Sequence, residues 1–405
     1  MKTAAQAGAL LLAIASGAAL CSTASAYPLF NFFEVTQIAQ NAVLGLNVPQ
    51  AVPGFELVLF KDGRQVYRRT FGNWQRDQVA NADSATKTLS GALILSLADH
   101  ADGPFSLNTR LSDYNPAFSG PKSNITVRQC FSHTAGFGDS SAVSNRFITL
   151  QQAGTQIASE LLVYPPGTTF SYGGTSMQAA GAVAELAGGK SWNALFEERI
   201  AGPLQLQATR YVLTTPVNPR IAGGCESTAM EFARFMEMLR SDGVYDGQRI
   251  LSHNAVTQMF TRQTPANVII ANTPLEGSAD YGVGVWLDQR LSDGTLVGAQ
   301  AAGARGFSAW VDFDDGMVGA FATDLTSGQN IRALVDLIRD AAQASVRNPR
   351  PCAADFNVDA FLDFRDVDDF IYSFESGDPS SDYNEDGFLT FEDYDAFIEA
   401  FLSGC

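Results

Sequence analysis

The sequence predicts an α+β fold in which an antiparallel sheet, flanked by helices, carries an inserted helical region and is followed by a small all-α domain. Three observations indicate this. Strand-like runs stand near both ends of residues 27–345, the stretch between them is mostly helical in pattern, and residues 352–405 repeat an acidic loop and a helix. A chain of 405 residues has room for one large core and one small one.

The N-terminus has the pattern of a secretory signal peptide. An apolar run ends at Ala24-Ser25-Ala26, a small-residue cleavage site, so we expect residues 1–26 to be removed on export. A membrane anchor is the weaker alternative, because the apolar core at 7–20 is shorter than the about 20 residues that span a bilayer. Lipidation at Cys21 is disfavoured because a large leucine precedes it. We expect a secreted, periplasmic or cell-surface protein without a membrane span.

Charge and cysteines divide the chain unevenly. Of the formal charge of −17, residues 352–405 account for −14, with 15 Asp and Glu against one Arg, and we expect no nucleic-acid partner. Cys352 and Cys405 bracket this acidic segment and are expected to form a disulfide. Cys130 and Cys225 are either bridged or simply buried.

The first structural elements are a helix and a hairpin. "FEVTQIAQNAVLG" (33–45) predicts a helix, and "FELVLFKDGRQVYRRTFG" (55–72) predicts two strands that turn at Asp62-Gly63. "LSGALILSLADHA" (89–101) has the length and composition of a helix.

The rest of the large domain is helical and then returns to strands. Residues 106–260 include the helical stretches "SMQAAGAVAELAG" and "TAMEFARFMEMLRSDG", each ending in Gly. "YGVGVWLD" (281–288) and "GFSAWVDFDDGMVGAFATD" (306–324) predict strands, and "NIRALVDLIRDAAQAS" (330–345) predicts a helix. One sheet built from both ends of this domain is expected, and "VRNPRP" (346–351) has the composition of a linker.

The acidic segment contains two copies of one twelve-residue loop, at 355–366 and 382–393. Calcium takes six to eight oxygen ligands, and oxygen-bearing side chains at loop positions 1, 3, 5, 9 and 12, with a backbone carbonyl at position 7, supply them. The predicted ligands are Asp355, Asn357, Asp359, Phe361, Asp363 and Asp366, then Asp382, Asn384, Asp386, Phe388, Thr390 and Asp393.

One feature weakens the calcium prediction for the first loop, a second weakens it for both loops, and a third argues against disorder. Ala360 stands where the sharp turn favours Gly, and position 12 is Asp rather than Glu in both loops. The alternative of a disordered acidic tail is disfavoured by the aromatic, helix-like stretches "FIYSF" and "DAFIEAF". Residues 352–405 resemble a dockerin domain, which implies structural Ca²⁺, folding that depends on it, and a cohesin-like or surface protein partner.

"SATK" (84–87) is the candidate catalytic sequence. At a helix start, Ser84 and Lys87 face the same way at i and i+3, and a buried lysine of lowered pKa can take a proton from serine. Taken alone, an ordinary helix start with a surface lysine is an open alternative. The chain has only three histidines, His100, His133 and His253, and none lies in a G-x-S-x-G context.

The segments around this serine resemble the serine β-lactamase and penicillin-binding-protein-like superfamily, especially its class C-like esterase branch. The resemblance rests on "SATKTLSGALILSLADHADGPFSLNTRLSDYNPAF", "ITVRQCFSHTAGF", "YPPGTTFSYGGTSMQAAGAVAELAG" and "GARGFSAWVDFDDG", and it covers residues 30–345. It implies a β-lactamase-like fold with Ser84 as nucleophile and Lys87 as general base. Tyr172 would relay a proton, and the backbone N–H groups of Ser84 and Ala304 would form the oxyanion hole.

The chain departs from this family pattern at two places. Gly174 stands where the family usually has Asn, and Ala301-Ala302-Gly303 stands where Lys-Thr-Gly or His-x-Gly is usual. Arg305 is either a replacement for the missing cation or a solvent-facing side chain. His133 matches a family position that is usually structural, and Tyr172 has the alternative of a packed loop tyrosine.

These observations lead to one expected function and two alternatives. The leading expectation is a secreted serine hydrolase, a carboxylesterase acting on a small-molecule ester or cell-wall-related substrate, with no cofactor for catalysis. A D-amino-acid peptidase or β-lactamase is the enzymatic alternative. A catalytically inactive binding or scaffold protein is the alternative from another class.

Overall fold

The computed structural model describes residues 30–46, 48–99, 103–275, 277–325, 331–347, 354–357, 362–384 and 386–403. We call residues 30–347 the body and residues 354–403 the tail. The predicted signal peptide and the predicted disulfide between Cys352 and Cys405 lie outside the described residues.

A six-stranded antiparallel sheet forms the centre of the body, as the sequence predicts. Its strand order is β12-β13-β14-β15-β1-β2, so the N-terminal hairpin pairs with strands from the far end of the body through β15 and β1. The strands are β1 (Gly54–Lys61), β2 (Arg64–Gly72), β12 (Trp286–Arg290), β13 (Leu296–Ala302), β14 (Ser308–Asp312) and β15 (Met317–Ala322).

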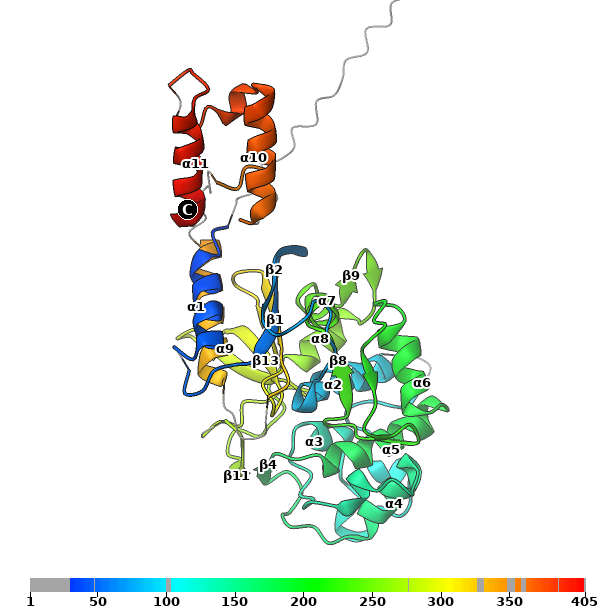
Figure 1. Cartoon of the computed structure of the whole chain (residues 1–405). Coiled ribbons are helices and arrows are strands. Elements are labelled where there is room, and N and C mark those ends of the chain that lie inside the picture. The colour runs from blue at the N-terminus through cyan, green and yellow to red at the C-terminus, as the bar shows by residue number, and fades with distance from the viewer. Residues whose placement is uncertain are drawn as a thin grey trace, which may run out of the picture.

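Helices cover both faces of this sheet (Figure 1). One face packs against α1 (Phe33–Leu44) and α9 (Arg332–Arg347), and the other against α7 (Ala229–Arg240) and α2 (Thr86–Ala98). In β1, Val58 therefore belongs to one core, while Leu57 and Leu59 belong to the other. Burial on both faces explains why "FELVLF" is almost continuously apolar.

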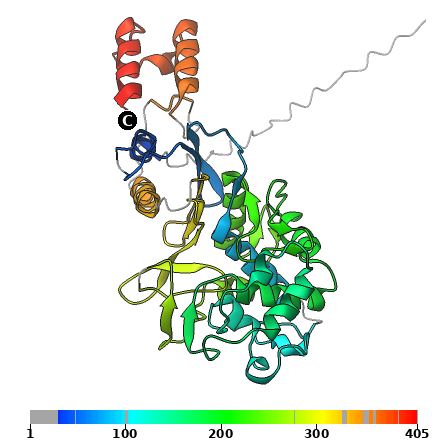
Figure 2. The same ribbon diagram turned by 60° about the horizontal axis from the view of Figure 1, so that its bottom comes forward.

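The helical region between the two sets of strands forms the far side of the body (Figure 2). Its helices are α3 (Val127–Phe131), α4 (Leu150–Ser159), α5 (Thr175–Gly188), α6 (Trp192–Phe196) and α8 (His253–Met259). Short strands form small sheets beside these helices. One sheet has three strands, β3 (Ala80–Asn81), β8 (Cys225–Ser227) and β5 (Arg210–Tyr211). The others have two strands each: β4 (Thr169–Ser171) and β11 (Ile269–Asn272), β6 (Thr214–Thr215) and β7 (Asn218–Pro219), and β9 (Val244–Tyr245) and β10 (Gln248–Arg249). Cys130 and Cys225 are buried free thiols, so of the two alternatives only burial holds.

The tail contains two helices, α10 (Phe364–Ser376) and α11 (Phe391–Ser403), which lie side by side in both views (Figures 1 and 2). Their shared core is aromatic, and the rings of Phe370 and Phe397 stack with centroids 4.1 Å apart. Arg69 on β2 donates a hydrogen bond to the carbonyl of Leu362, which joins the tail to the body. Among the described residues, no helix has both the length and the apolar character needed to cross a membrane.

A buried ion-pair network fastens α9 to the sheet. The Arg339 side chain is 1% exposed; its Nη1 lies 2.9 Å from Asp288 Oδ2 and its Nε lies 2.9 Å from Asp312 Oδ1. Asp288 and Asp312 come from β12 and β14, so one arginine holds two strands and a helix together. Removing it would leave two carboxylates buried without their cation.

We therefore expect Arg339→Met to lower the free energy of unfolding by about 3–5 kcal/mol, because it leaves the two carboxylates buried without a partner. Lys190→Met is the matched control, since Lys190 pairs with Glu198 where both side chains are about half exposed. That control should change the free energy by less than about 1 kcal/mol. Urea unfolding of both variants measures the difference, and equal effects would show that the Arg339 network does not stabilise the body.

Candidate active site

Ser84 lies on a 3₁₀ turn, Asp83–Ala85, that runs directly into α2. From Thr86 to Leu97 this helix is buried at every position, which is why its sequence has no polar face. Lys87 is only 3% exposed, so the alternative of a surface lysine at an ordinary helix start is wrong. Close packing needs Gly91, where a Cβ atom would lie 2.1 Å from the carbonyl oxygen of Val283.

The Lys87 amine faces the Ser84 hydroxyl. Its Nζ lies 2.9 Å from Ser84 Oγ and donates at 2.8 Å to the carbonyl oxygen of Ala222. Burial lowers the pKa of Lys87 from 10.5 to about 7, against the opposing effect of the Asp83 carboxylate. Near neutral pH a large share of this amine is uncharged and has a lone pair available for the serine proton.

Tyr172 follows β4 and stands beside the same pair. Lys87 Nζ lies 4.5 Å from the centroid of its ring, and burial raises the pKa of Tyr172 to about 12, although hydrogen bonds to Ser84 and Trp286 lower it. The hydroxyl therefore stays protonated near neutral pH and can donate. The Trp286 ring stacks on Tyr172 at 5.4 Å, so Tyr172 is packed and at the same time faces the serine.

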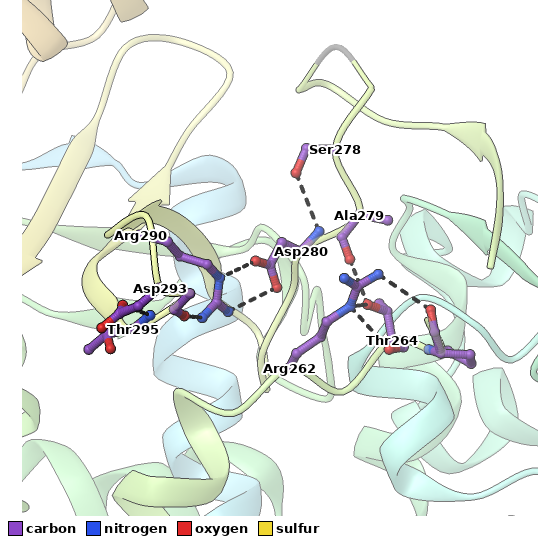
Figure 3. A network of polar contacts seen from close by, with 10 residues as sticks. Arg262, Thr264, Ser278, Ala279, Asp280, Arg290, Asp293 and Thr295 are labelled. Atoms are coloured by element: carbon purple, nitrogen blue, oxygen red, sulfur yellow. Dashed lines mark hydrogen bonds and ion pairs between the residues drawn. The ribbon is translucent and has the colours of Figure 1, made fainter. Parts of the chain in front are cut away.

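The segment that carries Trp286 is held by polar contacts shown in Figure 3. Arg290 Nε lies 2.7 Å from Asp280 Oδ2, and Thr264 Oγ1 donates to the carbonyl oxygen of Ala279 at 2.6 Å. The first contact ties the last residue of β12 to the chain just before the turn that leads into this strand, and the second ties the same chain segment to Thr264. Trp286 is thereby held in position against Tyr172.

His133 lies behind Tyr172 in an aromatic cluster. Its ring centroid is 4.5 Å from that of Tyr172, and its Nδ1 accepts a hydrogen bond from the Gly173 N–H at 3.4 Å. Burial and the Lys87 charge hold its pKa well below 6.5, so the ring is neutral. These contacts support the expected structural role.

Ala304 reaches the nucleophile through a tight turn after β13. The Gly303 N–H donates to the carbonyl of Phe307 at 2.7 Å, and a Cβ atom on Gly303 would lie 2.5 Å from the carbonyl oxygen of Ala82. Only glycine allows this approach to the residues just before Ser84. Ala304 and Ser84 consequently line the same cavity.

An ion pair joins the residues that flank these two positions. Arg305 donates to both carboxylate oxygens of Asp83, at 2.9 and 3.0 Å, and its Nη1 lies 3.1 Å from Asp324 Oδ1. We call the pair of Asp83 and Arg305 the clamp. The clamp argues against Arg305 as a free replacement cation, because two carboxylates neutralise it, while its side chain remains 30% exposed to solvent.

The cavity in front of Ser84 has a volume of about 370 Å³ and walls that are mostly apolar. Apart from Ser84 and Tyr172, its lining includes Leu275, Trp286, Ala302 and Ile331. The Ala301-Ala302-Gly303 segment brings no cation to the cavity, since Ala301 faces the core and Ala302 faces the cavity. An acyl or alcohol group of modest size would fit.

Comparison with known proteins places this architecture in a family. The family model described as Beta-lactamase matches residues 39–343. The chain belongs to the beta-lactamase family. It thus has a serine hydrolase fold, and its predicted nucleophile, Ser84, lines the cavity.

Relatives of this beta-lactamase family member include peptidases and esterases. The D-alanyl-D-alanine-carboxypeptidase/endopeptidase AmpH of Escherichia coli (strain K12) is 25% identical over 336 residues, which cover 73% of this chain and 85% of the relative. A candidate beta-lactamase structure from Bacteroides dorei DSM 17855 has a TM-score of 0.70 at 25% identity and covers 79% of this chain and 100% of its own. A family VIII carboxylesterase structure has a TM-score of 0.63 at 19% identity, with 78% and 97% covered, and shows the shared fold alone.

The structure brings together all four predicted catalytic positions, Ser84, Lys87, Tyr172 and Ala304. Sequence reasoning missed the Ala222 carbonyl that holds the lysine. A backbone oxygen carries no residue signature, so no sequence signal could have found it. The clamp was also missed, although Asp83 and Arg305 each adjoin a recognised position.

The two tail loops repeat the same hydrogen bonds 27 residues apart. Asp366 accepts from the N–H groups of Asn357 and Asp363 at 3.3 and 2.8 Å, and Asp393 accepts from those of Asn384 and Thr390 at 3.1 and 2.8 Å. Both carboxylates are fully buried, while Asp382 and Asp386 accept N–H groups within the second loop.

The predicted calcium ligands are only partly described. Asp359 and Phe361 lie outside the described residues, and Asp355 and Phe388 are described as a buried and an exposed loop residue. Within the described ranges, no three His, Cys, Asp or Glu side chains are arranged to hold a metal ion. Calcium binding by these loops thus stays a prediction.

The lowered pKa of Lys87 leads to a pH prediction. With the deprotonated Lys87 amine as the predicted base, kcat/KM for a neutral aryl ester should rise with pH and level off above an apparent pKa of about 7. Lys87→Arg should lose this activity, because arginine stays charged. Lys190→Arg, at an exposed lysine, should keep the parent profile. A midpoint near the ordinary lysine value would contradict the role of burial.

Proposed function

We propose that this protein is a secreted carboxylesterase that works through an acyl-enzyme on Ser84. The observation that carries the proposal is the buried Lys87 amine, 2.9 Å from Ser84 Oγ and with a pKa of about 7. The Ser84 oxygen forms a bond to the ester carbonyl carbon, and its proton passes to Lys87. The N–H groups of Ser84 and Ala304 stabilise the oxyanion.

Collapse of this tetrahedral species breaks the bond to the alcohol oxygen. Tyr172, protonated because of its raised pKa, donates the proton that the leaving alkoxide needs and is reprotonated from Lys87. A water molecule then attacks the acyl carbon and gives its proton to the same amine. The carboxylic acid leaves, and Ser84 regains its hydrogen.

The composition of the cavity favours an uncharged ester over a β-lactam or peptide. A carboxylate-bearing substrate needs a cation, yet Ala301 and Ala302 replace the usual one. The two arginines nearby are paired with carboxylates: Arg305 with Asp83 and Asp324, and Arg332, which lines the cavity, with Asp336. D-amino-acid peptidase activity is the second candidate, and the resemblance to AmpH favours it. A purely binding protein would have no need of a lysine with lowered pKa beside its serine.

The direct test is labelling by a fluorophosphonate, read by intact mass, together with hydrolysis of short-chain aryl esters. We expect one adduct and ester turnover in the parent protein, and neither in Ser84→Ala. Ser90→Ala is the matched control, since Ser90 lies on the same helix with its hydroxyl bonded to Tyr211 and Ile221, and it should keep both. A folded parent protein without adduct and turnover would support the binding or scaffold alternative.

For the tail we propose calcium binding and attachment to a cohesin-like or surface protein. The repeated loop hydrogen bonds and the oxygen-rich spacing support this. Titration of the whole protein with calcium should give saturable heat and a higher melting temperature that EDTA reverses. Asp382→Asn should weaken binding, whereas Asp395→Asn, exposed on α11, should not. An unchanged melting temperature without calcium heat would rule out the calcium proposal.

A further inference from the structure

The cavity in front of Ser84 contains one polar side chain that the proposed mechanism does not use. Gln300 lies on β13, two residues before Ala302 and on the same face of the strand. Its side chain is 1% exposed and lines the cavity. The residue is therefore almost wholly enclosed by protein, and it borders the cavity.

This amide has no protein partner. Across the described residues, no side-chain hydrogen bond or ion pair involves Gln300 beyond the backbone pairing of β13 with its neighbours. A buried amide with unmade hydrogen bonds destabilises a fold, which is why nearly all such groups are paired. A ligand bound in the cavity would supply the hydrogen bonds that this amide does not form with the protein.

Gln178, another buried glutamine, shows what a structural amide looks like in the same protein. Its Nε2 donates at 2.9 Å to both Asn218 Oδ1 and the carbonyl of Pro219, and its Oε1 accepts from the Ile221 N–H at 3.1 Å. Both polar atoms of the Gln178 side chain form hydrogen bonds within the protein. The Gln300 side chain makes none of these bonds, and it lines the cavity instead.

The charges around the cavity decide which ligand suits Gln300. Arg305 is paired with Asp83, and Arg332, which also lines the cavity, lies 3.5 Å from Asp336. A neutral amide offers one acceptor and two donors, so its complement is an uncharged group that both accepts and donates. A carboxylate could not satisfy the Gln300 carbonyl.

We propose that Gln300 is a specificity-determining residue: its amide hydrogen-bonds an uncharged amide or hydroxyl group that the ester substrate carries several bonds from its scissile carbonyl. The inference rests on the proposed esterase function for the identity of that carbonyl. It deepens the proposed function by naming the substrate class, an ester with a neutral hydrogen-bonding group at a distance from the bond that is cut.

The test measures binding in a Ser84→Ala background, so that no turnover is needed. The probes are phenyl esters of straight-chain acids that end in a methyl, acetamido, hydroxyl or carboxylate group, in several chain lengths. At the best length, we expect the acetamido or hydroxyl ester to bind about 10-fold tighter than its methyl counterpart. Adding Gln300→Met, similar in size but without hydrogen-bonding groups, should reduce that preference to less than about threefold.

Controls separate this role from a structural one. Gln248→Met, exposed on β10, should keep the full preference. Gln300→Met and Gln300→Leu should melt no lower than the parent, because the Gln300 amide forms no hydrogen bond that the substitution would remove. Gln178→Met should melt clearly lower, because it loses three hydrogen bonds. A lowered melting temperature for both Gln300 variants would show a structural amide and overturn the proposal.

Two binding outcomes would also overturn it: equal affinity for all four ester types, or a preference that survives Gln300→Met. Tightest binding of the carboxylate, lost in Arg332→Gln, would assign recognition to the arginine instead. Absence of ester turnover by the parent protein would contradict the proposed function alone, since the binding comparison does not depend on catalysis.

Discussion

A lysine amine that is to accept a proton at neutral pH must be kept out of water, and this constraint governs the layout of the body. Lys87 meets it by lying on a helix that is buried on every side. Such a helix needs walls all round, and the chain supplies them from the sheet and from the helical region. The strands at both ends of the body and the helices between them together enclose this amine.

Helices and strands that have a clear local sequence pattern were predictable, and so were the candidate catalytic positions within them. The hairpin, α1 and α2 depend on short patterns, and Ser84 and Lys87 are three residues apart on one turn. Tyr172 and Ala304 were placed by resemblance, and the structure brings both to the cavity. Partners that meet only through the fold, such as the Ala222 carbonyl and Asp83 with Arg305, leave no local pattern to detect.

Buried polar groups are treated in two ways in this protein. Those that hold the fold, such as Arg339 and Gln178, have their hydrogen bonds completed by neighbouring chain segments. Those that face the cavity can still form hydrogen bonds with a bound ligand, as Ser84 and Gln300 can. The difference was invisible in the sequence, because the two glutamines sit in equally apolar surroundings and only the three-dimensional contacts distinguish them.

The clamp also bears on folding. Asp83 and Arg305 are 222 positions apart, and the strands that flank Arg305 join the N-terminal hairpin through the pairing of β15 with β1. Contacts that close so long a stretch of chain are expected to form late, because the entropy of closing the loop must be met first. A chain with an incomplete sheet would hold Ser84 and Lys87 together but lack the N–H group of Ala304, the proposed second oxyanion donor. On the proposed mechanism, a nascent or misfolded chain should therefore have no esterase activity.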